Sequence, residues 1–191
     1  MQEVFIYSLK NILLKIKIVT YRIFFLSVLL TFCNLNYCQI TSRSSQILLP
    51  EPINYTSDYS NIFSDIEENK LNNLIQYIEK HTLIEFAIIS ITNRMKGDLK
   101  INEFAKSIGN KWGVGKKYLY NGIIIVINKE SREIYIQPGK GIEKIYTTEQ
   151  LKIVIDETIK PFFRIDAYYE GVFASIIRLT EELKPKLKDI K

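Results

Sequence analysis

The sequence predicts an α/β fold, a three-layer α/β/α sandwich over a small mixed sheet that contains one antiparallel hairpin. Two apolar runs, at residues 84–91 and 122–127, have the length and composition of buried strands. Segments with helical spacing of apolar residues precede and follow these runs. A third strand, at 132–136, follows the second run after only four residues, and so short a turn joins antiparallel strands.

The first helix is expected from about residue 65 to 80. Ser64 suits the N-cap position, and Glu67 three residues later completes a capping box. One apolar face follows at i, i+3, i+4 and i+7, formed by Leu71, Leu74, Ile75 and Ile78. The second helix is expected at about 101–111, because apolar residues keep the helical period there and Gly113 and Gly115 then stop it.

Two more helices are expected after the hairpin. Thr147 and Gln150 form a second capping box at the start of the third helix. Pro161 is expected to end or kink this helix. The last helix is expected from about Asp166 to Leu183. A short fourth strand near residues 53–55 is only weakly indicated.

The N-terminal 38 residues have the pattern of a signal peptide. Basic residues precede an apolar run at 23–32, which is shorter than the roughly 20 residues that a spanning helix needs. We expect cleavage after Cys38 and an extracytoplasmic protein, periplasmic or secreted, with no membrane span in the mature chain. A retained N-terminal anchor is the alternative. Residues 39–52, rich in Ser, Thr and Pro, predict a linker, 53–183 the domain, and 184–191 a polar tail.

Charge and cysteine content narrow the function of the mature chain. The formal net charge is +5, but residues 1–38 hold a surplus of three, which leaves 22 basic and 20 acidic residues. This balance does not favour nucleic acid as a partner. Both cysteines, Cys33 and Cys38, lie in the leader, so the mature chain has no disulfide, no thiolate metal ligand and no cysteine nucleophile.

Four segments, in order along the chain, resemble the TPM domain family. The first motif is Asp58-Tyr-Ser-Asn-Ile-Phe-Ser64, and the second is Lys111-Trp-Gly-Val-Gly-Lys-Lys117 leading into Asn121-Gly122. The third is Arg132 to Ile136 followed by Gly139-Lys-Gly-Ile-Glu143, and the fourth is Ile159-Lys-Pro-Phe-Phe-Arg-Ile-Asp166 followed by Tyr168-Tyr-Glu-Gly171. No single segment is specific, but four in register make a chance match improbable.

The resemblance implies a domain that works outside the cytoplasm or in the thylakoid lumen, often beside membranes. We therefore expect an exported accessory domain whose partners are unidentified membrane or envelope proteins, acting for example in assembly or repair of membrane complexes. The alternative is a divalent-metal-dependent acid phosphatase, since that activity is also proposed in the family. Family membership alone does not decide between these functions. No local pattern identifies a catalytic nucleophile or base, and a helix end explains the only histidine, His81.

The resemblance also implies a divalent-metal site, usually for Ca²⁺ and less suited to Mg²⁺. If the loops around the sheet gather at one end, the ion would take oxygen ligands from Asp58, Asn121, Glu143 and Asp166. Simpler roles remain open: a helix N-cap for Asp166, a turn for Asp58 and a solvated loop charge for Glu143. The chain also departs from the family, because Tyr120 stands where Asp usually precedes Asn-Gly, which weakens the expectation of a metal.

Overall fold

The computed structural model describes residues 17, 19–24, 26–27, 47, 49–116 and 118–190. The chain divides into two compact units, residues 1–46 and 47–191. In the first unit the described residues are helical. The predicted cleavage site and most of the predicted linker lie outside the described residues. Within the described ranges, no helix combines the length and the apolar character that crossing a bilayer requires.

The second unit contains a four-stranded mixed sheet in the order β1-β2-β3-β4. The first three strands are parallel and the last pairs antiparallel with β3, as the predicted hairpin requires. The strands are β1 (Thr56–Asp58), β2 (Glu85–Ser90), β3 (Gly122–Asn128) and β4 (Glu133–Pro138). The weakly indicated strand at 53–55 is therefore present three residues later.

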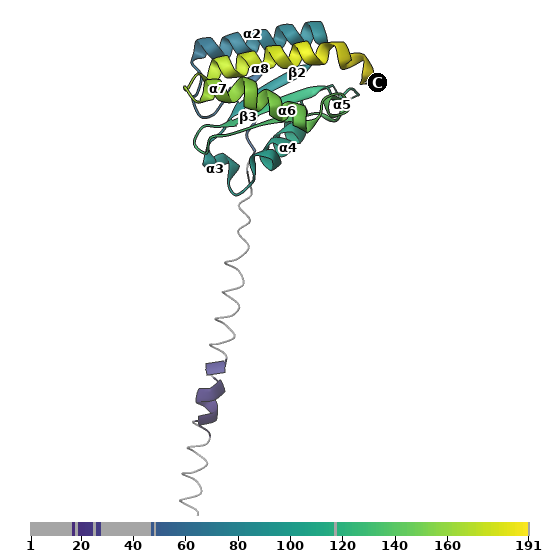
Figure 1. Cartoon of the computed structure of the whole chain (residues 1–191). Helices are drawn as coiled ribbons and strands as arrows, with labels where there is room; N and C mark the ends of the chain where they lie inside the picture. Colours follow the sequence, from purple (N-terminus) through teal and green to yellow (C-terminus); the bar gives the residue numbers. More distant parts are fainter. Residues whose placement is uncertain are drawn as a thin grey trace, which may run out of the picture. The chain divides into compact units, whose positions relative to one another are not determined.

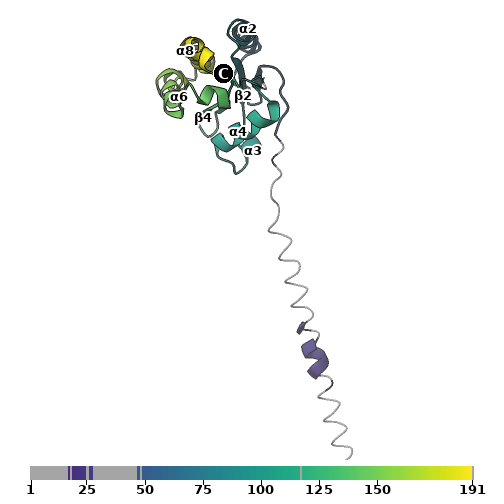
Figure 2. The ribbon, with the colours of Figure 1, turned by 90° about the vertical axis from the view of Figure 1, so that its right-hand side faces the viewer.

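Helices cover both faces of the sheet and make the predicted three layers (Figure 1, Figure 2). One face is covered by α2 (Asp65–Thr82), α6 (Thr148–Val154) and α8 (Tyr168–Leu183). The other face is covered by α4 (Ile101–Trp112), with the short α3 (Asn93–Lys96) nearby.

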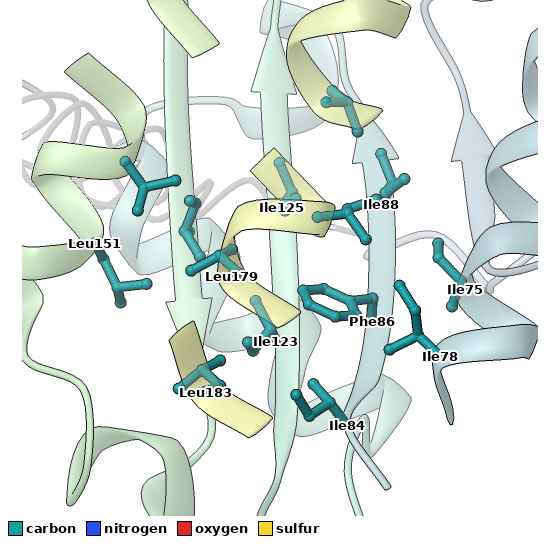
Figure 3. Packing of buried hydrophobic residues seen from close by; sticks show 14 of the residues in the cluster. Ile75, Ile78, Ile84, Phe86, Ile88, Ile123, Ile125, Leu151, Leu179 and Leu183 are labelled. Atoms are coloured by element: carbon teal, nitrogen blue, oxygen red, sulfur yellow. The ribbon is translucent and has the colours of Figure 1, made fainter. Parts of the chain in front are cut away.

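Each face of the sheet has its own apolar core, because side chains alternate along a strand. On the first face Phe86, Ile88, Ile123 and Ile125 meet helix side chains such as Leu179, as Figure 3 shows. On the second face Ile89, Ile124 and Val126 pack against Phe104, Ala105 and Ile108 of α4. Burial on both faces explains why β2 and β3 read as continuous apolar runs.

Both predicted capping boxes are present. The Ser64 hydroxyl accepts from the backbone N–H of Glu67, whose carboxylate accepts from the Ser64 N–H. Thr147 and Gln150 make the same pair at the start of α6. These contacts use backbone donors that a helix start otherwise leaves without partners.

Of the two effects expected of Pro161, an end or a kink of the third helix, the structure does not show an end. The helix passes from α6 into a π-helical turn, η1 (Ile155–Ile159), and then into α7 (Lys160–Phe163), with Pro161 near the start of α7. A proline nitrogen cannot donate, so it is tolerated where a new helical segment begins. The last helix begins at Tyr168 with Ala167 as its N-cap, so Asp166 lies just outside the helix and does not cap it.

Both ends of the described domain extend beyond the predicted boundaries. Residues of the predicted polar tail form a 3-10 helix, η2 (Lys184–Asp189), and Ile190 is buried in the first core. At the other end Ile47 and Leu49 pack on the second core, and the Trp112 indole N–H donates to the Pro50 carbonyl 2.9 Å away. A short helix, α5 (Lys140–Glu143), follows β4.

Candidate functional site

The four predicted metal ligands lie at two opposite ends of the sheet. Asp58 ends β1, and Asp166 lines a cavity together with Asn128, the last residue of β3. Both therefore lie at the carboxyl end of the parallel strands. Asn121 precedes β3, and Glu143 closes α5 after β4, so both lie at the amino end. The loops that carry these residues do not gather at one place.

The two oxygens of Asp58 both accept hydrogen bonds from the protein. Oδ2 accepts from the backbone N–H of Phe63 at 2.8 Å, and Oδ1 accepts from the hydroxyl of Ser90 at the end of β2. Ser90 also accepts from the backbone N–H of Ser60. Asp58 thus closes the loop between β1 and α2, a longer span than the turn expected from sequence.

Asn121 holds the loop before β3 from within. It is 1% exposed. Its Oδ1 accepts from the Lys116 backbone N–H at 2.7 Å, and its amide donates to the Leu83 carbonyl. The loop before β3 also contacts the start of β2, because the Gly115 N–H donates to the Glu85 carboxylate. Within the loop the backbone passes so close to itself that a Cβ on Gly115 would lie 2.5 Å from the Gly122 nitrogen. The family's glycine motif therefore has a packing reason in this chain.

A cavity of about 630 Å³ opens at the amino end. Glu143 and Tyr120 both line it, along with glycines of the two flanking loops. The backbone N–H of Gly141 donates to the Tyr120 carbonyl, which brings the two loops together. A carboxylate at position 120, as in the family pattern, would therefore lie in the same cavity as Glu143 and at the far end of the sheet from Asp58.

The four residues do not fit one Ca²⁺ ion. Calcium takes six to eight oxygen ligands around one point, whereas these residues are divided between the two ends of parallel strands. The oxygens of Asp58 and Asn121 already accept hydrogen bonds within the domain. The surroundings of Asp58 fit a residue that holds a loop closed, and Glu143 is an exposed charge at the end of α5.

A second cavity, of about 330 Å³, lies at the carboxyl end and is lined by several positively charged side chains. Its polar lining includes Lys129, Arg132, Lys160 and Arg164, against Glu133 and Asp166. Lys160 forms an ion pair with Asp156, but Arg132 and Arg164 have no carboxylate within ion-pair distance in the described ranges. Such a cavity favours anions. Sequence reasoning missed it, because its cations come from two segments with no common motif.

Aromatic side chains form one wall of this basic cavity. Phe163 and Tyr168 lie with ring centroids 4.7 Å apart, and the Lys129 ammonium lies 5.0 Å from the Tyr168 ring centroid. Burial, and then the hydrogen bond that its hydroxyl donates to Asp166, raises the pKa of Tyr168. Tyr168 therefore stays neutral at physiological pH and presents a hydroxyl rather than a charge.

The amino end carries exposed bulky side chains instead. Leu83, Tyr118 and Tyr120, here called the amino-end patch, are 49%, 89% and 52% exposed. Leu83 and Tyr120 adopt left-handed backbone conformations, with φ of 69° and 48°. Tyr168 and Tyr169, by contrast, begin α8 and are partly buried.

Comparison with known proteins identifies the family. The TPM domain model matches residues 56–182. Among solved structures, the N-terminal domain of a P. gingivalis protein shares 24% identity with a TM-score of 0.62, covering 70% of this chain and 84% of that chain. A protein from the psychrophilic bacterium Bizionia argentinensis shares 18% identity with a TM-score of 0.58, covering 68% and 86%.

An N-terminal domain from Corynebacterium glutamicum is also similar, with 14% identity, a TM-score of 0.52 and coverage of 72% and 82%. At these identities the structures support the fold alone. No curated protein matches the chain. The family match spans the sheet, most of both cores and all four resembling segments, and this chain therefore belongs to the TPM domain family.

Proposed function

We propose that this chain is an exported accessory domain that acts outside the cytoplasm by binding membrane or envelope proteins. The observation that carries the proposal is the amino-end patch. A left-handed conformation costs a residue other than glycine roughly 1 kcal/mol or more, and bulky side chains rarely adopt it. Tyr120 adopts it while remaining half exposed, in the position where the family usually has aspartate.

Internal packing does not explain this choice of residue. Leu83 has the same conformation and exposure, and the Asn121 amide links its carbonyl to the loop that carries Tyr120. Strained, exposed, bulky residues cluster at functional sites, and tyrosine is enriched in protein interfaces. The C-cap position of α2 explains the backbone conformation of Leu83, whose N–H donates to the Glu79 carbonyl. A partner that covers the patch supplies the reason for the exposed side chains of Leu83 and Tyr120.

The test is site-specific photocrosslinking in the native cells. A benzophenone amino acid replaces Tyr118 in one strain and Tyr77 in another, since Tyr77 is also an exposed tyrosine and lies on α2. We expect a discrete crosslink to an envelope protein from position 118, weakened when Leu83→Ser and Tyr120→Asn are added. Equal crosslinking from both positions, or none from position 118, would contradict the proposal.

Export is tested separately by N-terminal sequencing of the protein recovered from the cell envelope or medium. We expect the mature chain to begin at Gln39. A chain that keeps its first 38 residues in the cytoplasm would contradict the location, whatever the crosslinking shows.

The basic cavity favours a second candidate, an acid phosphatase. Guanidinium groups bind phosphate oxygens in pairs, and Arg132 and Arg164 have no carboxylate partner among the described residues. The measurement is hydrolysis of p-nitrophenyl phosphate by the native chain and by Arg164→Gln, with and without Ca²⁺ or Mg²⁺. Hydrolysis that falls at least about tenfold in the variant would support this function, and equal rates would exclude a role for the cavity.

Calcium binding is measured by calorimetric titration of the native chain and of Tyr120→Asp. We expect tighter binding by the variant, because the added carboxylate lies in the same cavity as Glu143. Equal affinities would show that position 120 is not part of a calcium site.

A further inference from the structure

The outer edge of β4 has backbone groups with no partner strand. In the sheet β4 has β3 on one side only. The Gly139 N–H donates to the Gly122 carbonyl, and hydrogen-bonded pairs alternate along an antiparallel ladder. The backbone groups of Tyr135 and its alternate neighbours therefore face β3, whereas Ile134 and Ile136 direct their N–H and C=O groups to the open edge.

Within the described ranges, no side chain or loop hydrogen-bonds these outward groups of Ile134 and Ile136. The edge is closed only at its end. Pro138 has no N–H to offer, and its carbonyl accepts from the Gln137 side-chain amide at 2.8 Å. Ile134 is partly buried and borders the groove, whereas Ile136 is 2% exposed, so an added strand must displace the side chains beside Ile136 before it can pair there.

An apolar groove runs beside this edge. It has a volume of about 380 Å³ and takes its apolar lining from Ile101 and Tyr135 on one face of the sheet and from Leu151 and Ile155 on the other. Figure 2 shows β4 between α4, which supplies Ile101, and α6, which supplies Leu151. An added strand would place alternate side chains against these two walls.

The charges along the groove favour an acidic occupant. Glu133 is paired with Lys96 at 3.0 Å and Asp156 with Lys160 at 2.6 Å, so both carboxylates along the groove are neutralised. Arg132 and Lys152 line the same groove and have no carboxylate within ion-pair distance in the described part of the chain. The basic cavity continues this positive character, since Arg132 lines both hollows.

We propose that the free edge of β4 binds an extended acidic segment of a partner protein as a fifth strand of the sheet. Ile134 and Ile136 supply the backbone hydrogen bonds, the groove walls receive alternate apolar side chains, and Arg132 and Lys152 select for carboxylates. A second copy of this chain is a poorer occupant, because it would bring like charges together. The proposal concerns a different surface from the amino-end patch and is independent of the accessory role.

The first test uses peptides against the full chain. The probe is a peptide of alternating valine and glutamate or threonine residues, and its control carries lysine in place of glutamate. We expect the acidic peptide to bind at least about tenfold more tightly. Two N-methylated versions, each methylated on one set of alternate residues, complete the set. Methylation of the set that faces β4 should abolish binding, and methylation of the other set should not.

The second test is amide hydrogen exchange of the ¹⁵N-labelled chain. Binding should protect the Ile134 and Ile136 amides and leave Tyr135, already bonded to β3, unchanged. Lys152→Glu should weaken the acidic peptide about tenfold, while Lys106→Glu, the same charge change on exposed α4, should not.

Three outcomes would overturn the proposal. Equal affinity for both peptides, or no binding of either at millimolar concentration, would contradict the proposal that the partner segment is acidic. Binding without slower amide hydrogen exchange at Ile134 and Ile136 would show that the peptide does not bind as an added strand. Protection that appears without peptide and rises with protein concentration would assign the edge to a second copy of this chain.

Discussion

The two edges of the sheet differ in how their backbone groups are used. At the β1 edge, the Thr56 N–H donates to the side-chain oxygen of Asn72 on α2 at 2.7 Å. At the β4 edge, Ile134 and Ile136 have no such partner among the described residues. Edge strands promote unwanted pairing unless they are short, covered or interrupted. One edge of this domain is closed by a side-chain hydrogen bond. The other edge is a longer strand whose outward backbone groups have no hydrogen-bond partner among the described residues.

The largest expected effect tests whether packing beside the two edges is equally firm. Ile75 on α2 and Leu151 on α6 are both buried, one near each edge. We expect Ile75→Ala and Leu151→Ala each to lower the free energy of unfolding by about 2–5 kcal/mol. Urea denaturation measures both, with Ile75→Val and Leu151→Met as mild controls. A nearly neutral Leu151→Ala would mean that the β4 side is loosely packed, and the comparison would then concern more than hydrogen bonds.

The next effect opens the closed edge. Asn72→Leu removes the acceptor of the Thr56 N–H, and Thr56 is fully buried. Leaving a buried donor unpaired costs about 1–3 kcal/mol. Asn72→Asp keeps an oxygen at the same place and should lose less, by the same denaturation measurement. Equal losses in the two variants would show that this hydrogen bond does not close the edge.

A smaller effect on stability depends on pH and comes from one of two tyrosine–glutamate hydrogen bonds. Tyr55, just before β1, donates to Glu79, and Tyr146, just before α6, donates to Glu182. The hydrogen bond from Tyr146, and then the one from Arg178, lowers the pKa of Glu182. The pair therefore contributes stability above the ordinary glutamate pKa of 4.5 and loses it as the pH falls.

We expect Glu182→Gln to reduce the fall in the free energy of unfolding between neutral and acid pH. The reduction should be less than about 1 kcal/mol, because the side chain is partly exposed. Denaturation at pH values from 7 to 3 measures it, with the exposed neighbour Glu181→Gln as the control. An acid loss that is unchanged in Glu182→Gln would assign it to other carboxylates.

The smallest effect separates stability from binding at the open edge. Arg132 has φ of 55°, a conformation that asparagine adopts more readily. Arg132→Asn should raise the free energy of unfolding by a few tenths of a kcal/mol to about 1 kcal/mol, while it weakens binding of the acidic peptide. If stability and affinity fell together, the variant would have damaged the hairpin, and Arg132→Gln, which removes the charge but keeps a long side chain, would then test the charge.

The fold was predictable from local patterns. The apolar runs at 84–91 and 122–127 identified the central strands because both sides of these strands are buried. The capping boxes fixed two helix starts. Other features depend on distant contacts. The 3-10 helix after Leu183 lies beside a buried Ile190, and a π-helical turn before Pro161 continues the helix where proline suggested an end or a kink.

The candidate sites were less predictable, because sequence does not say at which end of a sheet a loop lies. Asp58 and Asn121 belong to opposite ends once β1, β2 and β3 are known to be parallel. The basic cavity combines the hairpin turn at Lys129 with α7 and the residues after it, more than 30 positions apart. The open edge of β4 depends on strand order, which no local pattern of this chain encodes.

The neighbouring positions of α2 and α8, which both cover one face of the sheet, have a consequence for synthesis. The strands pair in the order in which they are made, so β1 to β4 can assemble behind the growing chain. The buried face of α2, including Leu71, Ile75 and Ile78, shares its core with Leu179 and Leu183 of α8. The apolar surface of that layer stays partly exposed to solvent until residues 168–183 have been made, and the nascent domain needs protection from aggregation during that interval.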